Sequence, residues 1–298
     1  MKLLVLSALV LALLAAPAQA SQTGVVVSDD GRITARGEIR PDDRFRVGSV
    51  TKTFVSTTIL QLEAEGRLSL DDPAERYVPG VGAIPLRALL NHTSGLNNHS
   101  EDPQVFEGWP LRRWEPRQLV DIGLAMPRKA GFAYSNTNYV ILGLVVEAVT
   151  RRPLERELER RIIKPLKLRY TSYDEGPRVR GVVRGTAAGE DVTVQDTSWA
   201  GAAGSLVSTG RDLARFYGSL DRLLTRKQLK AMRGTGEYGL GLFSVQTPCG
   251  RAWGHNGAVP GYLTHAFTRG DRTVVVLVDE QPTDERPAVR RLTRALCA

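Results

Sequence analysis

The pattern of apolar and polar positions predicts β-strands at both ends of the chain. Residues 24–28 are mostly apolar, residues 29–31 form the turn sequence Asp-Asp-Gly, and residues 32–38 alternate, so an N-terminal β-hairpin is expected. Near the C-terminus, turns rich in Gly and Pro separate further strand-like runs. These runs predict four consecutive strands, at 238–246, 252–256, 262–268 and 273–279, followed by a helix at 285–296.

The middle of the chain has apolar residues at helical spacing. Residues 50–65 predict a helix that ends at Gly66, a residue suited to helix ends. Thr209 with Asp212 three residues later predicts a capping box at the start of a helix over 209–220. Other helices are expected at 117–124, 138–150 and 154–163, whereas residues 176–194 are expected to be irregular or weakly stranded.

Strands at both ends with helices between them can form one antiparallel sheet. We expect the hairpin to join the C-terminal strands, with the terminal helices packed on the sheet and a helical lobe alongside. The sheet lobe would comprise about residues 21–48 and 236–298, and the helical lobe about residues 67–235, within a single domain. An active site would then lie in the crevice between the lobes.

The first twenty residues have the three-part layout of a secretory signal peptide. One cation, Lys2, precedes an apolar run over 3–16, and small residues flank Gln19 before a cleavage position after Ala20. The apolar run is short for a transmembrane helix. We therefore expect export of residues 21–298 as a secreted protein, associated with the cell wall if with anything, without a stable membrane anchor; a retained N-terminal anchor is the alternative.

Composition narrows the classes of partner. The chain is 42% hydrophobic and 24% charged, which is ordinary for a globular protein. Its net charge of +8 favours anionic surroundings such as a cell wall or membrane surface. Nucleic acid is not expected, because the arginines are dispersed and form no basic stripe with interleaved aromatics. Cys249 and Cys297 suggest one disulfide, and no His or Cys at ligand spacing near them indicates a metal site.

Ser49-Val50-Thr51-Lys52 is the first motif that suggests chemistry. At a helix start, residues three apart face the same way, so the Lys52 amine can reach the Ser49 hydroxyl. A desolvated lysine with a lowered pKa can accept the serine proton, and the helix N-terminus favours negative charge there. Alone, the motif is equally compatible with a capped helix and a solvated lysine.

Tyr134-Ser135-Asn136 is the second motif, on a loop that enters the helix predicted at 138–150. A tyrosine beside a lysine can shuttle a proton to a leaving group. Asn136 offers both a donor and an acceptor to a substrate amide. The same three residues also make an ordinary turn and cap sequence, so the motif acquires meaning only in combination with others.

His255-Asn256-Gly257 is the third motif, at the end of a predicted strand. Glycine at a strand edge lets a substrate lie against the backbone, and a nearby N–H can complete an oxyanion hole. Taken alone, His255 could be a turn residue. The other histidines are not expected to be catalytic: His92 is expected to be a hydrogen-bonded core or loop residue, and His99 lies in a polar loop.

The order of the three motifs resembles that of the penicillin-recognising serine hydrolases. Their signature has a Ser-x-x-Lys box, a Ser/Tyr-x-Asn box and a Lys/His-x-Gly strand. The Tyr and His forms found here are similar to the branch that contains class C β-lactamases, D-alanyl-D-alanine carboxypeptidases and related esterases. Residues 46–53, 89–96 and 203–209 also resemble recurrent segments of that branch, and the resemblance runs from about Gly24 to the C-terminus.

The resemblance implies a β-lactamase/transpeptidase-like α/β fold and an acyl-enzyme mechanism that needs no metal and no cofactor. Ser49 would attack a carbonyl, and Lys52 with Tyr134 would carry the proton to the leaving group and then activate the deacylating water. The N–H groups of Ser49 and Ala258 would form the oxyanion hole. The residues that would bind or orient the substrate are Asn136, His255, Asn256, Gly257 and Ala258.

The segment around Cys249, together with Cys297, resembles secreted actinobacterial D-alanyl-D-alanine carboxypeptidases. Those enzymes have hydroxyl residues where this chain has Asn256 and Ala258, and both hydroxyls help to hold the terminal carboxylate of the substrate. We therefore expect weakened carboxylate recognition here. Arg251 has the strand parity of His255, which makes it a candidate substitute contact.

The expected function is that of a D-alanyl-D-alanine carboxypeptidase-like hydrolase acting on cell-wall peptides. An esterase or a class C-like β-lactamase is the alternative within the same chemistry, so the expected partner is a wall peptide, an ester or a β-lactam. A non-catalytic protein that binds wall peptides or penicillin is the alternative of another class. The presence of Ser49, Lys52 and Tyr134 together favours an enzyme.

Overall fold

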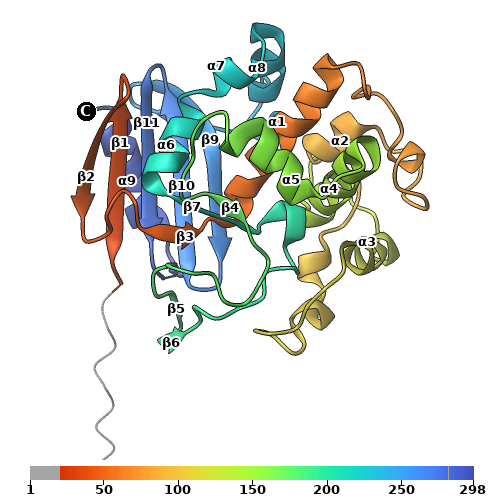
Figure 1. Ribbon diagram of the computed structural model, residues 1–298, viewed down its shortest axis with the longest axis horizontal. Coiled ribbons are helices and arrows are strands. Elements are labelled where there is room, and N and C mark those ends of the chain that lie inside the picture. Colours follow the sequence, from red (N-terminus) through yellow and green to blue (C-terminus); the bar gives the residue numbers. More distant parts are fainter. Residues whose placement is uncertain (1–20, 281) are drawn as a thin grey trace, which may run out of the picture.

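The computed structural model describes residues 21–280 and 282–298 (Figure 1), so the signal peptide predicted at residues 1–20 lies outside the described part of the chain. Within that part, no helix has the length and apolar character needed to cross a membrane.

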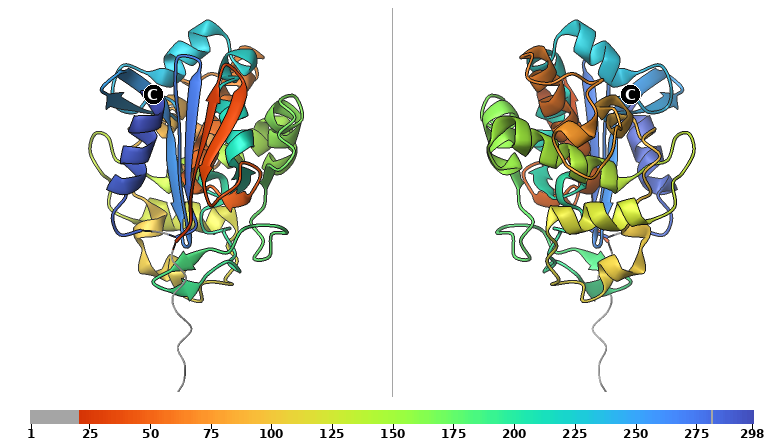
Figure 2. Two further views of the ribbon diagram at one scale, coloured as in Figure 1. Left: turned by 90° about the vertical axis from the view of Figure 1, so that its left-hand side faces the viewer. Right: turned by 90° about the vertical axis from the view of Figure 1, so that its right-hand side faces the viewer.

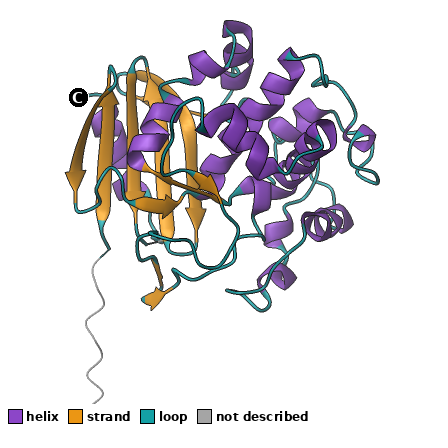
Figure 3. Ribbon diagram, in the orientation of Figure 1, coloured by secondary structure: helices purple, strands orange, loops and turns teal. Residues whose placement is uncertain are grey.

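The two ends of the chain share one antiparallel sheet, as the sequence predicts. The N-terminal strand pairs directly with the last strand of the chain, for example at Val26↔Val275. The sheet lies toward one side of the molecule and most of the helices toward the other (Figure 3). In spatial order its strands are β2 (Arg32–Gly37), β1 (Thr23–Asp29), β11 (Arg272–Val278), β10 (Tyr262–Arg269), β9 (Gly250–Val259) and β8 (Phe243–Thr247).

The edge of this sheet differs from the sequence prediction in one way that matters for function. The strand β8 begins at Phe243 rather than at 238, and Tyr238 forms only an isolated bridge with Phe243. Gly239 explains the late start, because a Cβ there would lie 2.2 Å from the Met232 carbonyl oxygen, so this segment packs on a helix instead. The β8–β9 ladder therefore ends at Phe243↔Gly254, and the last five residues of β9 extend beyond it.

Helices cover both faces of the sheet (Figure 2). The terminal helix α9 (Arg286–Leu296) packs on one face through Ala288, Leu292 and Leu296. On the other face lie α6 (Gly210–Tyr217) and the helical lobe. Because both faces are covered, the central strand β11 is buried and continuously apolar from Val274 to Val278.

The helical lobe is built around two buried helices, α1 (Thr51–Ala64) and α4 (Asn136–Thr150). All residues of α1 from Thr51 to Leu60 are buried. Thr57 and Thr58 avoid unpaired hydroxyls by donating to backbone carbonyls four residues earlier. Around them lie α2 (Leu86–Leu90), α3 (Pro116–Ala125), α5 (Leu154–Leu158), the π-helical turn η5 (Glu159–Ile163), α7 (Leu220–Leu223) and α8 (Arg226–Arg233).

Short elements connect the lobes. A three-stranded sheet has the order β3 (Arg44–Arg46), β7 (Leu206–Thr209), β4 (Ser172–Tyr173), and a small hairpin pairs β5 (Thr186–Ala187) with β6 (Glu190–Asp191). Several 3-10 turns complete the fold: η1 (Gly48–Val50), η2 (Ala74–Arg76), η3 (His99–Glu101), η4 (Pro103–Phe106) and η6 (Gly201–Ala203).

The capping box predicted at Thr209 is only half formed. The Thr209 hydroxyl accepts the N–H of Asp212 at 3.1 Å, as expected. The Asp212 carboxylate, however, accepts the N–H of Tyr170 and the hydroxyl of Thr171 instead of returning to Thr209. Tertiary partners therefore outcompeted the local partner, and α6 is tied to the segment after η5.

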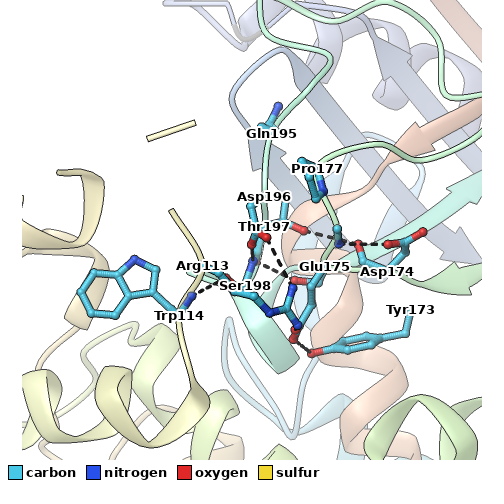
Figure 4. A network of polar contacts seen from close by, with 12 residues as sticks. Arg113, Trp114, Tyr173, Asp174, Glu175, Pro177, Gln195, Asp196, Thr197 and Ser198 are labelled. Carbon is cyan, nitrogen blue, oxygen red and sulfur yellow. Dashed lines mark hydrogen bonds and ion pairs between the residues drawn. The ribbon is translucent and has the colours of Figure 1, made fainter. Parts of the chain in front are cut away.

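A polar network holds the segment that leads to η6 (Figure 4). The guanidinium of Arg113 lies 3.1 Å from Glu175 and 3.4 Å from Asp196, and the Tyr173 hydroxyl donates to Glu175 at 2.7 Å. Asp196 is almost fully buried, so its carboxylate needs the donors that it has, the Arg113 guanidinium and the Ser198 N–H. The network fixes the approach of the chain to η6, which borders the candidate site described below.

The cysteines are joined by a disulfide, which confirms the pairing predicted from the sequence. The Cys249–Cys297 bond links the turn between β8 and β9 to the residue after α9, with 5.6 Å between the two Cα atoms. It closes a loop with a sequence separation of 48 residues. The bond therefore ties the strand that carries the His255 motif to the C-terminus.

Replacing both cysteines, by Cys249→Ser with Cys297→Ser, should lower the free energy of unfolding by about 2–4 kcal/mol, because the link restricts the unfolded chain. Urea unfolding of the variant and of the oxidised and reduced wild-type protein measures the change. The variant should match the reduced wild type; a midpoint equal to that of the oxidised protein would contradict a structural role for the bond.

Candidate active site

The Ser49 turn lies directly against strand β9. Ser49 is the middle residue of η1, the 3-10 turn that leads directly into α1 at Thr51. Gly48 has a φ of +51°, and a Cβ on it would lie 2.8 Å from the backbone nitrogen of Ala258. Both its conformation and its surroundings therefore require glycine at this position. The sequence separates these segments by about two hundred residues, and the fold brings them into backbone contact.

Lys52 is fully buried, and its amine has three polar neighbours. The Nζ atom lies 2.8 Å from Ser49 Oγ, 2.8 Å from Asn136 Oδ1 and 2.8 Å from the carbonyl oxygen of Ala203. None of these groups is charged, and no carboxylate pairs with Lys52 among the ion pairs of residues 21–280 and 282–298. Burial lowers the pKa of Lys52 well below that of an exposed lysine.

The three neighbours suit a neutral amine that acts on Ser49. Carbonyl oxygens can only accept, so the two N–H groups of a neutral Lys52 can go to Asn136 Oδ1 and the Ala203 oxygen. The nitrogen lone pair is then left facing the Ser49 hydroxyl, which can donate its proton. This arrangement is the one that a general base on a serine nucleophile needs.

Burial shifts the pKa of Tyr134 in the opposite direction to that of Lys52. The Ser49 side chain interacts with the Tyr134 hydroxyl, and Lys52 Nζ lies 4.9 Å from the centre of the Tyr134 ring. Burial raises the pKa of Tyr134 far above its ordinary value, so the phenol keeps its proton. Two groups on the same serine whose pKa values are driven apart are suited to act as base and acid respectively.

Asn136 is the first residue of α4, and both ends of its amide are engaged inside the protein. The oxygen faces Lys52, and the nitrogen donates to the Ser100 hydroxyl at 2.9 Å. The backbone N–H of Asn136 donates to the Asn98 side chain. The side chain thus holds the lysine amine in place, and its donor group, which the sequence associates with a substrate amide, already has a partner.

His255 is buried on β9, and its ring contacts Tyr238 rather than Lys52. The distance from His255 Nε2 to the Tyr238 hydroxyl is 3.2 Å, and Nδ1 faces the Asn256 carbonyl oxygen. Burial, with the nearby Lys52, lowers the pKa of His255 to about 3, so the ring is neutral at ordinary pH. His255 can therefore orient groups through hydrogen bonds, and it brings no positive charge to the site.

The end of β9 forms the wall opposite Ser49. A Cβ on Gly257 would lie 2.1 Å from the Val47 carbonyl oxygen and 2.8 Å from the Ser49 backbone nitrogen. Only glycine permits this approach, which brings the Ser49 N–H close to the strand that carries Ala258. This placement is compatible with an oxyanion hole formed by the N–H groups of Ser49 and Ala258, which remains a prediction.

Two residues associated with the site by sequence are not brought to Ser49. Asn256 is the cross-strand partner of His265, whose ring contacts Glu285 at the start of α9. Side chains alternate along a strand, so Asn256 is directed to the opposite face from His255. Arg251 lies four residues, about 13 Å, from His255 along β9, and its guanidinium donates to the Thr235 carbonyl oxygen.

Several contributors to the site had no recognisable sequence signal. The Ala203 oxygen is a backbone atom, so no side-chain pattern could indicate it. Tyr238 and Tyr139 extend the aromatic surroundings: Lys52 Nζ lies 5.5 Å from the Tyr139 ring centre, and Tyr238 contacts His255. Across residues 21–280 and 282–298, no three His, Cys, Asp or Glu side chains are grouped to hold a metal ion.

Comparison with known proteins identifies relatives in the family that the sequence motifs resemble. The family model described as Beta-lactamase matches residues 12–298. PbpX of Bacillus subtilis (strain 168), a protein named for penicillin binding, is 27% identical over 285 residues, which cover 86% of this chain and 70% of PbpX.

Two similar solved structures are named for amide hydrolysis. A D-stereospecific amidohydrolase from Streptomyces sp. has 36% identity and a TM-score of 0.84, with 91% of this chain and 93% of that chain covered. A D-amino acid amidase from Ochrobactrum anthropi SV3 has 26% identity and a TM-score of 0.79, with 91% and 94% covered. These likenesses confirm the fold class predicted from the sequence.

Gly257→Ala should abolish most activity, because the added methyl group would push β9 away from the Ser49 turn. A displacement of about 1 Å in such a site costs about 100-fold in rate. The rate at which a serine-reactive phosphonate labels Ser49 measures the effect. Gly236→Ala is the matched control, since a Cβ there meets nothing within 4 Å. Equal labelling rates in the two variants would exclude a functional contact between Gly257 and the Ser49 turn.

Proposed function

The chain belongs to the beta-lactamase family of serine hydrolases, and from that premise we propose that it cleaves amide bonds on the carbonyl side of D-amino acid residues through an acyl-enzyme on Ser49. The observation that carries the proposal is the contact between the buried Lys52 amine and the Ser49 hydroxyl, 2.8 Å apart with no counter-charge on the lysine.

The proposed reaction has two steps that use the same groups. In acylation, Lys52 accepts the Ser49 proton while Oγ attacks the amide carbonyl. Tyr134 donates its proton to the leaving nitrogen and is reprotonated by Lys52, so the C–N bond breaks as the ester bond forms. In deacylation, water gives a proton to the same pair, attacks the ester carbonyl and restores the Ser49 hydroxyl. The N–H groups of Ser49 and Ala258 would stabilise the oxyanion.

The D-configuration is supported by the relatives rather than by the geometry of the site. Both structural relatives described above are named for D-stereospecific or D-amino acid amide hydrolysis. A D-alanyl-D-alanine peptide belongs to the same chemical class, because its scissile amide follows a D-residue. The carboxypeptidase function expected from the sequence is thus a narrower case of this proposal.

The site offers little for a free terminal carboxylate. The sequence associated three basic residues with the site. Lys52 has a strongly lowered pKa, His255 is neutral, and the Arg251 guanidinium donates to the Thr235 carbonyl oxygen. A charge-assisted hydrogen bond is typically worth about 1.5–3 kcal/mol, or roughly 10- to 150-fold in rate. Without one, amino acid amides and amidated peptides should react about as well as peptides that end in a free carboxylate.

We place this activity outside the cytoplasm. The disulfide between Cys249 and Cys297 is typical of oxidising compartments, and the signal peptide predicted at residues 1–20 would direct the chain there. The net charge of +8 would favour retention near an anionic wall or membrane surface.

The proposal is tested by turnover of the purified protein on a matched panel. D-alanine amide and L-alanine amide test stereochemistry, and a D-Ala-D-Ala peptide with a free or amidated terminus tests carboxylate recognition. A p-nitrophenyl ester and nitrocefin test the esterase and β-lactamase alternatives, and Ser49→Ala is the control. We expect D-selective amide hydrolysis, a difference of less than about 10-fold between free and amidated peptides, and no turnover by Ser49→Ala.

Two results would overturn the proposal. Turnover of the ester or nitrocefin alone would assign the site to an alternative hydrolase. Binding of the peptides without turnover or Ser49 labelling would favour the non-catalytic binding protein. Separately, Arg251→Ala should leave the ratio of the rates for free and amidated peptides unchanged; a selective loss of activity on the free-carboxylate peptide would restore Arg251 as a carboxylate contact.

A further inference from the structure

His92 lies in the loop after α2 with an unusual backbone and no exposure. The residue is 0% exposed, and its φ is +61°, in the left-handed region that non-glycine residues rarely adopt. Its ring is packed among aromatic side chains, with 4.3 Å between the ring centres of His92 and Tyr134. A conformation of this kind persists only where the surroundings hold it, and such residues are concentrated at functional sites.

His92 accepts two hydrogen bonds, one from the residue before Tyr134 and one from the residue after it. The His92 carbonyl oxygen accepts the N–H of Ala133 at 2.9 Å, and its ring Nδ1 accepts the N–H of Ser135 at 3.2 Å. The residues immediately before and after Tyr134 are thus bonded to one residue. Because the Tyr134 ring also packs on the His92 ring, its backbone and its side chain share the same support.

The neighbours of His92 fix its protonation state. Burial, with the nearby Lys52 and His255, holds the pKa of His92 well below its usual range, so the ring is neutral. The Ser135 N–H can only donate, which makes Nδ1 the acceptor and places the proton on Nε2. The Asn138 amide supports the same tautomer. Its oxygen accepts the Ser94 hydroxyl at 2.7 Å, so its nitrogen is the group that faces Nδ1, at 3.1 Å, and can donate to it.

This arrangement leaves the Nε2–H of His92 buried without a hydrogen-bond partner among the residues that the structure describes. An unpaired buried donor destabilises the fold, and so does the left-handed backbone. An apolar side chain at this position would avoid the unpaired donor, and glycine would avoid both the unpaired donor and the backbone penalty. The Nδ1 acceptor holds the residue that follows Tyr134, and the ring surface packs on Tyr134 itself.

We propose that His92 is a positioning residue for Tyr134, holding residues 133–135 so that the Tyr134 hydroxyl meets Ser49. The inference rests on the proposed function, because it takes Tyr134 to be the group that transfers the proton. Loss of the Nδ1 acceptor would leave the Ser135 N–H unpaired and let the loop shift. A shift of about 1 Å in a proton-transfer group lowers the rate by about 100-fold, and substrate binding should change little.

Two variants separate the acceptor from the ring. His92→Phe keeps an aromatic ring and removes the acceptor, whereas His92→Asn removes the ring and keeps an acceptor near Nδ1. Asparagine also tolerates the left-handed backbone better than most residues. Each variant is made in the wild-type protein and in the Tyr134→Phe background, and kcat, KM and the rate of Ser49 phosphonylation are measured.

We expect His92→Phe to lower kcat and the phosphonylation rate by about 100-fold with KM changed by less than about 3-fold. In the Tyr134→Phe background the same substitution should cost less than about 3-fold, because the group that it positions is already gone. His92→Asn should recover at least about 10-fold of the loss. A general structural defect would cost the same in both backgrounds, and that result would overturn the proposal.

Two further readouts keep the outcome unambiguous. If His92→Phe does not fold, as judged by circular dichroism and thermal unfolding, Asn138→Leu removes the amide that orients the ring and should show the same dependence on Tyr134. If the wild-type protein hydrolyses no member of the substrate panel but is still phosphonylated at Ser49, the proposed function fails. The His92 comparison is then decided by phosphonylation rates alone.

Discussion

The structure depends on one unfavourable placement: the amine of Lys52 is buried without a counter-charge. Burying an ammonium ion is costly, and the protein meets this cost by lowering the pKa of the lysine and surrounding it with three neutral oxygen atoms. Those atoms come from three separate elements, η1, α4 and η6. The folded helical lobe is therefore a requirement for the chemistry, because no local segment could supply all three.

The large sheet supplies the second half of the site. Pairing of β1 with β11 brings the N-terminal segment beside the C-terminal strands, and the end of β9 extends beyond β8 toward the Ser49 turn. Contact at this point is backbone to backbone, at Gly48 and Gly257. Stability and reactivity are thus connected: the Cys249–Cys297 bond secures β9, and β9 borders the nucleophile.

Local patterns predicted local features well. The hairpin follows from Asp-Asp-Gly, and the Ser49–Lys52 contact follows from helical spacing. Features set by tertiary contact were beyond the sequence: the Ala203 oxygen, the Tyr238 partner of His255, and the tertiary use of the Asp212 carboxylate. His92 is instructive, since the sequence correctly suggests a hydrogen-bonded buried residue, whereas only the fold shows that its bonds enclose Tyr134.

The charge of Lys52 is the most direct test, because a base on Ser49 must be a neutral amine. NMR spectroscopy of protein labelled at the lysine side chains can follow each amine through a pH titration, and loss of one signal in Lys52→Arg assigns Lys52. We expect that signal to titrate well below the value of about 10.4 typical of exposed lysines, with Ser49 phosphonylation rising over the same pH range. A Lys52 that titrates together with the exposed lysines, while phosphonylation proceeds at neutral pH, would contradict its role as the base.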